Sequence, residues 1–218
     1  MDLVKEYNKA FQLIEQWRYK HDIERMVHLF LEDWAFKHTG LYSPNDNITS
    51  TKEFTRIAIP LSHILSNLML HGVSDPLATI LTEYCKGHSK HLAYYPTPQS
   101  VTSLISSLMT SGNQNATSDD ISIYEPCVGT SGIVLQHIEQ TYLDRLHLDR
   151  PMQGVSITVE DINCYALYAF VVQLIHKIQY LSGFGGKPAE PDTIIINQVN
   201  VLSRKCGRVN YLFTQNKG

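Results

Sequence analysis

Two acidic residues follow two β-branched runs in this sequence, and a glycine turn follows the first of them. Glu125 ends the run 121–125, and Gly129 and Gly132 come next, just before a helical pattern. In a parallel α/β sheet the carboxyl ends of the strands line the ligand crevice, and free N–H groups at a helix start bind anions. These residues therefore predict a binding site for a small polar ligand.

Glu160 ends the second run, 155–160. A carboxylate at the end of the second strand accepts hydrogen bonds from both hydroxyls of a ribose in such folds, and Asp161 and Ile162 would flank an adenine ring. Each feature also has a purely structural interpretation. Gly-x-x-Gly alone would predict only a structural turn, and an acid before a helix is favoured by the helix dipole. Acids at the ends of two consecutive strands favour the ligand interpretation.

Helical periodicity dominates the first 90 residues, and strands then alternate with helices. The spacing of Ser50 and Glu53 predicts a capping box that opens a helix running to about Leu70, and Asp75-Pro76 predicts the start of the next. After residue 120 the patterns predict strands at 121–125, 155–160, 193–197 and 210–214, with helices at 131–145 and 163–181. This order indicates a parallel sheet with right-handed crossovers.

The 218 residues carry a net charge of −3 with a pI near 6.3, so the strongly basic footprint of an autonomous DNA-binding protein is missing. Arg204, Lys205 and Arg208 form the clearest basic cluster, which we interpret as a solvated turn before a strand. The four cysteines are widely spaced, which argues against a disulfide framework or a zinc knuckle and fits a reducing cytoplasm. We expect neither a metal site nor a membrane span.

Three segments together resemble the adenine-N6 DNA methyltransferases, most closely the modification subunits of type I restriction systems. Tyr95–Val101 is similar to a Tyr/Phe-x-Thr-Pro element of that family. Glu125–Gly132 is similar to its Asp-Pro-x-x-Gly-Ser/Thr-Gly-Gly motif, and Glu160–Asn163 is similar to its Glu-x-Asn motif. The resemblance covers roughly residues 74–214. It implies a Rossmann-like S-adenosylmethionine (SAM)-dependent methyltransferase fold with a truncated parallel sheet. We divide the chain into a helical region, 1–90, and a SAM-binding core, 91–218.

The resemblance also implies SAM as the cofactor. Glu125 and the glycine turn would hold its methionine part, Glu160 its ribose, and Ile162 would pack on its adenine. The cofactor-binding residues expected in this way are Tyr95, Thr97, Glu125, Pro126, Gly129, Thr130, Ser131, Gly132, Glu160, Asp161 and Ile162. The sequence departs from the family at Glu125, which replaces Asp, and at Ser131, where Gly is usual.

The family orients the target adenine with an Asn-Pro-Pro-Tyr/Phe motif after the fourth strand, and no Pro-Pro pair occurs here. The matching place reads Gln215-Asn216-Lys217-Gly218, so we predict no catalytic residue. We expect a SAM-binding protein that does not methylate DNA alone and acts by binding cofactor or a partner, in a regulatory, decoy or anti-restriction role. The alternatives are an active or split adenine-N6 methyltransferase, another SAM-consuming enzyme, and a relic that binds nothing.

Strand 210–214 would leave an apolar sheet edge, which proteins usually cover. A homo-oligomer, a protein partner or the chain's own helical N-terminal region would cover it. The expected ligands are SAM and S-adenosylhomocysteine, with DNA only through a complex.

Overall fold

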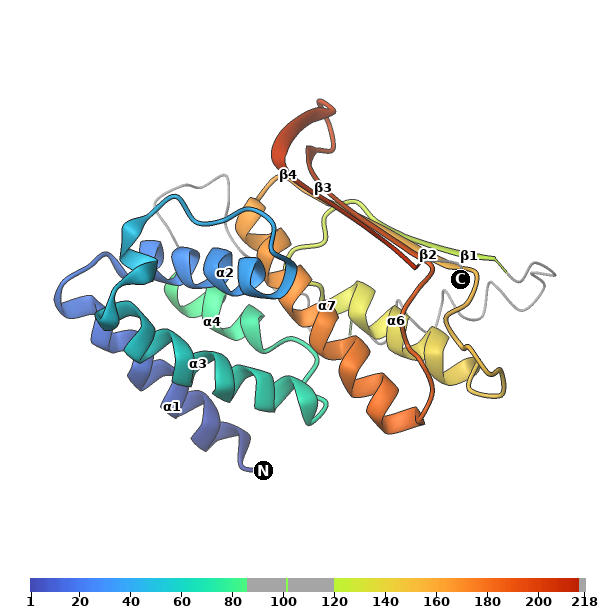
Figure 1. Ribbon diagram of the computed structural model, residues 1–218, viewed down its shortest axis with the longest axis horizontal. Coiled ribbons are helices and arrows are strands. Elements are labelled where there is room, and N and C mark those ends of the chain that lie inside the picture. The colour runs from blue at the N-terminus through green and yellow to red at the C-terminus, as the bar shows by residue number, and fades with distance from the viewer. Residues whose placement is uncertain (86–100, 102–119, 216–218) are drawn as a thin grey trace.

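The computed structural model describes residues 1–85, 101 and 120–215. The chain folds into a helical N-terminal region followed by an α/β layer (Figure 1). The helical elements of the first region are α1 (Leu3–Glu15), η1 (Gln16–Tyr19), α2 (Ile23–Thr39), η2 (Asn47–Ser50), α3 (Lys52–Leu70) and α4 (Pro76–Tyr84). This confirms the predicted α/β class with a helical N-terminal region.

Side-chain caps fix where the N-terminal α-helices begin. Asp2, Asp22, Thr51 and Asp75 each accept a hydrogen bond from a backbone N–H in the first turn of the helix that follows. The cap of α3 is Thr51 and not Ser50 as predicted, because Ser50 belongs to the 3-10 turn η2 that leads into the helix. The predicted end of α3 at Leu70 is confirmed.

The sheet contains four strands in the order β1-β2-β3-β4. Their bounds are β1 (Ile121–Glu125), β2 (Val155–Asp161), β3 (Thr193–Asn200) and β4 (Lys205–Thr214), with α6 (Gly132–Asp144) after β1 and α7 (Cys164–Gly185) after β2. The first three strands are parallel, as the alternation of strands and helices predicted.

The prediction for the last strand was wrong. β4 runs antiparallel to β3 and forms the far end of the sheet from β1. Only residues 201–204 separate the two strands, and a connection this short makes a hairpin, whereas a parallel pair needs a crossover of about a dozen residues. The described residues therefore contain no right-handed crossover between the third and fourth strands.

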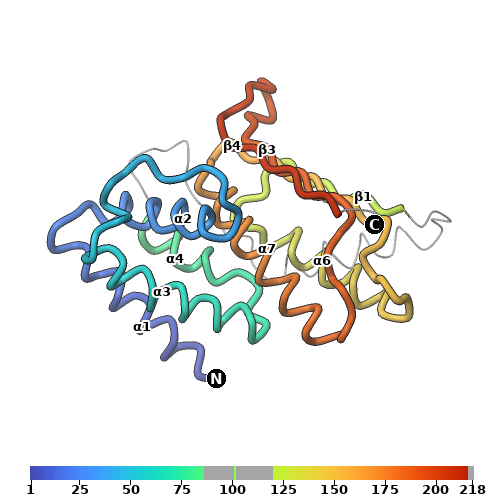
Figure 2. The backbone as a smooth tube through the Cα atoms, in the orientation of Figure 1, coloured from blue at the N-terminus to red at the C-terminus, as the bar shows by residue number. Residues whose placement is uncertain are grey.

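Helix α7 lies at the centre of the molecule. It is apolar on nearly all sides, as expected of a helix buried in protein, and it packs on α2 and α3 as well as on β2 and β3. In the described part of the chain, the helices lie on one side of the sheet (Figures 1 and 2). The N-terminal helices and the sheet consequently share one apolar core.

The free edge of β4 is covered at one point by the N-terminal region. The Tyr42 hydroxyl donates to the Asn210 carbonyl oxygen at 2.6 Å and accepts from the Asn210 N–H at 2.8 Å. Its ring packs edge-on against Tyr211. The chain thus satisfies an outward-facing backbone pair of this edge with its own residue.

Candidate functional site

Parallel pairing of β1 and β2 brings the predicted acidic residues to one edge of the sheet. Glu125 lies opposite Val159 in the register, one residue before Glu160. The turn after β1 runs along the end of β2, where the Val128 N–H donates to the Glu160 carbonyl oxygen at 3.0 Å. The carboxyl ends of the two strands and the glycine turn therefore lie together at one edge of the sheet.

The glycine turn is held by Asp161. One carboxylate oxygen of Asp161 accepts the Gly129 N–H at 2.9 Å, and the other accepts the Asn163 N–H at 2.8 Å. Gly129 has φ of +53°, a left-handed conformation that glycine adopts without strain. The Asp161 carboxylate thus joins the turn to the start of α7 through its two oxygens.

Burial raises the pKa of Glu125, and the neighbouring negative charge of Asp161 raises it further. Burial likewise raises the pKa of Asp161, although its hydrogen bonds from backbone N–H groups act in the opposite direction. A cationic group placed between Glu125 and Asp161 would stabilise the charged forms of both carboxylates.

Ser131 occupies the position where the resemblance predicts Gly, and its backbone has the left-handed φ of +100°. Its side chain is buried and its hydroxyl accepts a hydrogen bond from Gln173 at 3.1 Å, so it points into the protein. Ser131 precedes α6 and makes no side-chain hydrogen bond to the first turn. The other five described α-helices all have such a cap, so only α6 presents an uncapped first turn.

Gln173, in α7, holds the glycine turn in place through hydrogen bonds of its side-chain amide. Its amide nitrogen donates to the Thr130 carbonyl oxygen at 2.5 Å and to Asp75 at 2.9 Å, and its amide oxygen accepts the Leu77 N–H at 3.1 Å. The second oxygen of Asp75 accepts from the Thr130 hydroxyl at 2.7 Å. The start of α4, the glycine turn and the middle of α7 therefore belong to one hydrogen-bond network.

Glu160 is almost fully buried, with 4% of its surface exposed, and its carboxylate is paired within the chain. Arg204 donates to both of its oxygens, at 2.7 and 2.8 Å, and the Tyr124 hydroxyl donates to one of them at 2.8 Å. The hydrogen bonds from Arg204 are the main reason why the pKa of Glu160 is lowered.

Ile162, expected to contact adenine, is half exposed and borders a cavity of about 280 Å³ on the side of the β3–β4 hairpin. Polar hairpin residues, among them Asn200, Ser203 and Lys205, line the rest of this cavity. The Gln198 amide nitrogen donates to the Ile162 carbonyl oxygen at 3.2 Å, while its oxygen accepts the N–H groups of Arg208 and Val209. Gln198 thus ties the hairpin to the end of β2.

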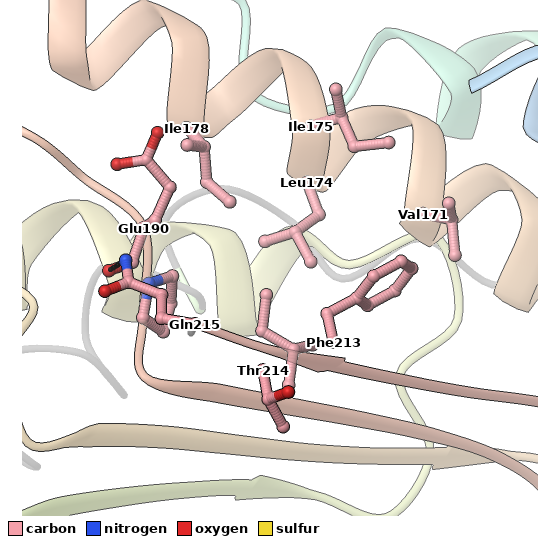
Figure 3. A pocket seen from close by; sticks show the side chains of 10 residues that line it. Val171, Leu174, Ile175, Ile178, Glu190, Phe213, Thr214 and Gln215 are labelled. Carbon is pink, nitrogen blue, oxygen red and sulfur yellow. Dashed lines mark hydrogen bonds between the residues drawn. The ribbon is translucent and has the colours of Figure 1, made fainter. Parts of the chain in front are cut away.

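A second cavity, of about 240 Å³, lies between α7 and the end of β4 (Figure 3). It is lined by apolar side chains of α7, including Leu174 and Ile178, and by Phe213 near the end of β4. It lies by Ile194, near the amino end of β3. Ligands of open α/β sheets bind at the carboxyl ends of the strands, so we place the candidate site at the carboxyl ends of β1 and β2 and not at this cavity.

The structure brings most of the predicted cofactor residues together. Glu125, Pro126, the turn 129–132 and residues 160–162 all lie at the carboxyl ends of β1 and β2 or in the loops that follow them. Tyr95 and Thr97 lie outside the described residues. Among the described residues no group of three or more His, Cys, Asp or Glu could hold a metal ion, and none of the described helices could cross a membrane.

The interpretation of the basic cluster as a solvated turn before a strand holds for Arg204, which is exposed in the turn that precedes β4, but not for Lys205 and Arg208, which lie within β4. Arg204 also pairs with Glu160, and Arg208 lies 3.7 Å from Glu32. The sequence analysis also missed Tyr124 and Gln173. Gln173 had one available signal, since it is a polar residue within the apolar run 166–175, whereas nothing in the sequence links Tyr124 to Glu160.

Comparison with known proteins gives one family match. A family described as N-6 DNA Methylase matches residues 69–180, just over half of the chain. No curated protein matches the chain at a significant level. A solved structure from Listeria monocytogenes, proposed as a class I S-adenosylmethionine-dependent methyltransferase, is 18% identical with a TM-score of 0.47. The match covers 79% of this chain and 50% of that one, so the chain spans about half of that protein's length.

Proposed function

The chain belongs to the N-6 DNA methylase family, and on that premise we propose that it binds SAM in the crevice at the carboxyl ends of β1 and β2. One observation carries the proposal: Glu125 and Glu160 lie at the carboxyl ends of adjacent parallel strands, beside a glycine turn that opens into the uncapped helix α6. This combination supplies carboxylates for a cation and a diol and N–H groups for an anion.

These residues fit the chemical groups of SAM. The free N–H groups at the start of α6 would bind its carboxylate, and Glu125, with Asp161 behind it, would attract its positive amino and sulfonium groups. Glu160 would accept the ribose hydroxyls, and Ile162 would pack on the adenine from the hairpin side. SAM itself would supply an activated methyl group.

We further propose that residues 91–218 form the cofactor-binding core and that residues 1–90 support it. Asp75 of the helical region belongs to the network that holds the glycine turn, which supports a structural role in binding. These 218 residues contain no Pro-Pro pair, the element with which the family holds its target adenine. We therefore propose that methyl transfer to DNA requires residues beyond these 218, and that these residues by themselves act by binding cofactor or a partner.

The test is calorimetric titration of the protein with SAM and with S-adenosylhomocysteine. Wild type should bind both, and Glu160→Gln should weaken binding by at least about tenfold, because the ribose loses a charged acceptor. Glu190→Gln is the matched control, since this exposed acid lies at the mouth of the other cavity and should leave the affinity unchanged. Failure of wild type to bind either ligand would overturn the proposal.

A split adenine-N6 methyltransferase is the second candidate. β1 ends the sheet in the described part of the chain, so its outer edge offers a place for a strand from another polypeptide. The test is incorporation of labelled methyl groups from SAM into DNA, with this chain alone and together with candidate partner chains. Incorporation that needs both chains would support the split enzyme, and none with any partner would exclude it.

A further inference from the structure

The carboxylate proposed to bind the ribose is already engaged by the chain's own Arg204. The two guanidinium nitrogens Nη1 and Nη2 donate to Oε2 and Oε1 of Glu160, at 2.7 and 2.8 Å. This is a bidentate pair, in which two parallel N–H donors engage both oxygens of one carboxylate. Tyr124 occupies a further acceptor position on Oε2.

A ribose presents a closely similar pattern to such a carboxylate. Its two neighbouring hydroxyls are two hydrogen-bond donors side by side, and a single acid accepts both in Rossmann-like sites. Because Glu160 is 4% exposed, it has little open surface on which to accept a second pair of donors. Arg204 and a ribose therefore compete for the same two oxygen atoms.

The β3–β4 hairpin delivers Arg204 to this position. Asn200 accepts the N–H groups of Leu202 and Ser203 with its side-chain oxygen, and its carbonyl oxygen accepts the Arg204 N–H at 2.7 Å. Arg204 then closes the turn with the left-handed φ of +55°, which is unfavourable for a residue with a side chain. The turn thus points an arginine back at the end of β2.

Leaving Glu160 would cost Arg204 little packing. Its side chain is 59% exposed in the paired state, whereas that of Glu160 is 5% exposed. Water solvates the released guanidinium, so the cost of breaking the pair lies mainly with the buried carboxylate, which the ribose hydroxyls would satisfy in turn. A ligand that offers Glu160 better hydrogen bonds can therefore displace the guanidinium while the hairpin backbone stays in place.

We propose that Arg204 is an internal competitor for the ribose of a bound nucleoside and sets the affinity of this site. The inference rests on the proposed function, because it assumes that Glu160 holds the ribose of SAM. Arg204 is thus an affinity-determining residue: it keeps the buried carboxylate paired in the free protein and makes the site weaker than its other residues would allow.

The test is calorimetric titration with SAM of wild type, Arg204→Ala and Arg208→Ala. Arg208→Ala is the matched control, because Arg208 is an exposed arginine of the same hairpin that pairs with Glu32 and not with Glu160. Both variants remove one positive charge. Arg204→Ala should bind SAM about fivefold more tightly than wild type, and Arg208→Ala should bind as wild type does. Circular dichroism checks that each variant is folded.

A double substitution shows whether the effect acts through Glu160. Adding Arg204→Ala to Glu160→Gln should bring no gain over Glu160→Gln alone, because the contested acceptor is already changed. If wild type binds SAM and Arg204→Ala binds equally or more weakly, the competition is excluded while the proposed function stands. If wild type does not bind SAM, the proposed function fails and the inference fails with it.

Discussion

Gln173 joins three segments that are far apart in the sequence, and its replacement by leucine measures what that junction contributes. Gln173, Leu77 and Thr130 are 1%, 0% and 3% exposed, so water cannot replace a lost hydrogen bond there. Leucine would remove the donor to the Thr130 carbonyl oxygen and to Asp75, and the acceptor of the Leu77 N–H.

The magnitude follows from the groups left without a partner. The Leu77 N–H and the Thr130 carbonyl would each cost about 1–3 kcal/mol, while Asp75 keeps its bonds from Ala78 and Thr130. The apolar leucine side chain offsets part of this loss in the buried helix. We expect Gln173→Leu to lower the free energy of unfolding by about 3 kcal/mol.

Urea unfolding followed by far-UV circular dichroism measures this loss. With an m value of about 2 kcal/mol/M the midpoint should fall by about 1.5 M. Gln140→Leu is the matched control: Gln140 lies on the surface of α6 and bonds only Asp144 among the described side chains, so the same chemical change there should cost below about 0.5 kcal/mol. Equal midpoints for Gln173→Leu and Gln140→Leu would refute the argument.

Two further predictions concern Asp75 and Tyr42. Burial raises the pKa of Asp75 above its usual value of 3.8. Between 3.8 and the raised pKa, the folded chain therefore binds more protons than the unfolded chain, and the free energy of unfolding falls as the pH rises. The stability of wild type relative to Asp75→Asn, measured by urea unfolding from about pH 4 to about pH 7, should therefore decrease with pH, and an unchanged difference would contradict the assignment. Tyr42→Phe removes both hydrogen bonds to Asn210 and should lower the free energy of unfolding by about 1 kcal/mol in the same assay. The control Tyr19→Phe, at a residue that is 88% exposed, should leave the free energy of unfolding unchanged. Equal effects of the two substitutions would exclude edge capping by Tyr42.

Local chemistry determined much of this protein from its sequence. Alternation of apolar residues located β1 at the residues observed and β2 to within one residue, and Asp75-Pro76 located the start of α4. These signals are local, because strand periodicity and helix capping act between residues close together in the chain. Once β1 and β2 were taken as parallel, the meeting of Glu125 and Glu160 at one edge followed from geometry.

The tertiary structure alone decided the pairing of the last strand. The sequence analysis ended the third strand at residue 197 and began the fourth at 210, which left room for a crossover. The structure extends both strands through polar residues such as Gln198, Asn200 and Lys205, which lack the alternation that marks a strand. Those residues pair because the hairpin satisfies their backbone groups, not because of a local preference.

The pairing of side chains around the candidate site also depended on contacts between residues far apart in the sequence. Arg204 meets Glu160 across 44 positions of sequence, and Gln173 meets Asp75 across 98. Which arginine reaches which carboxylate depends on where the hairpin folds back over the sheet, and no spacing rule carries that information. The sequence thus predicted a nucleoside site at Glu160, and only the folded chain decided that Arg204 pairs with this acid, because a pair so far apart in the sequence forms only when the sheet is assembled.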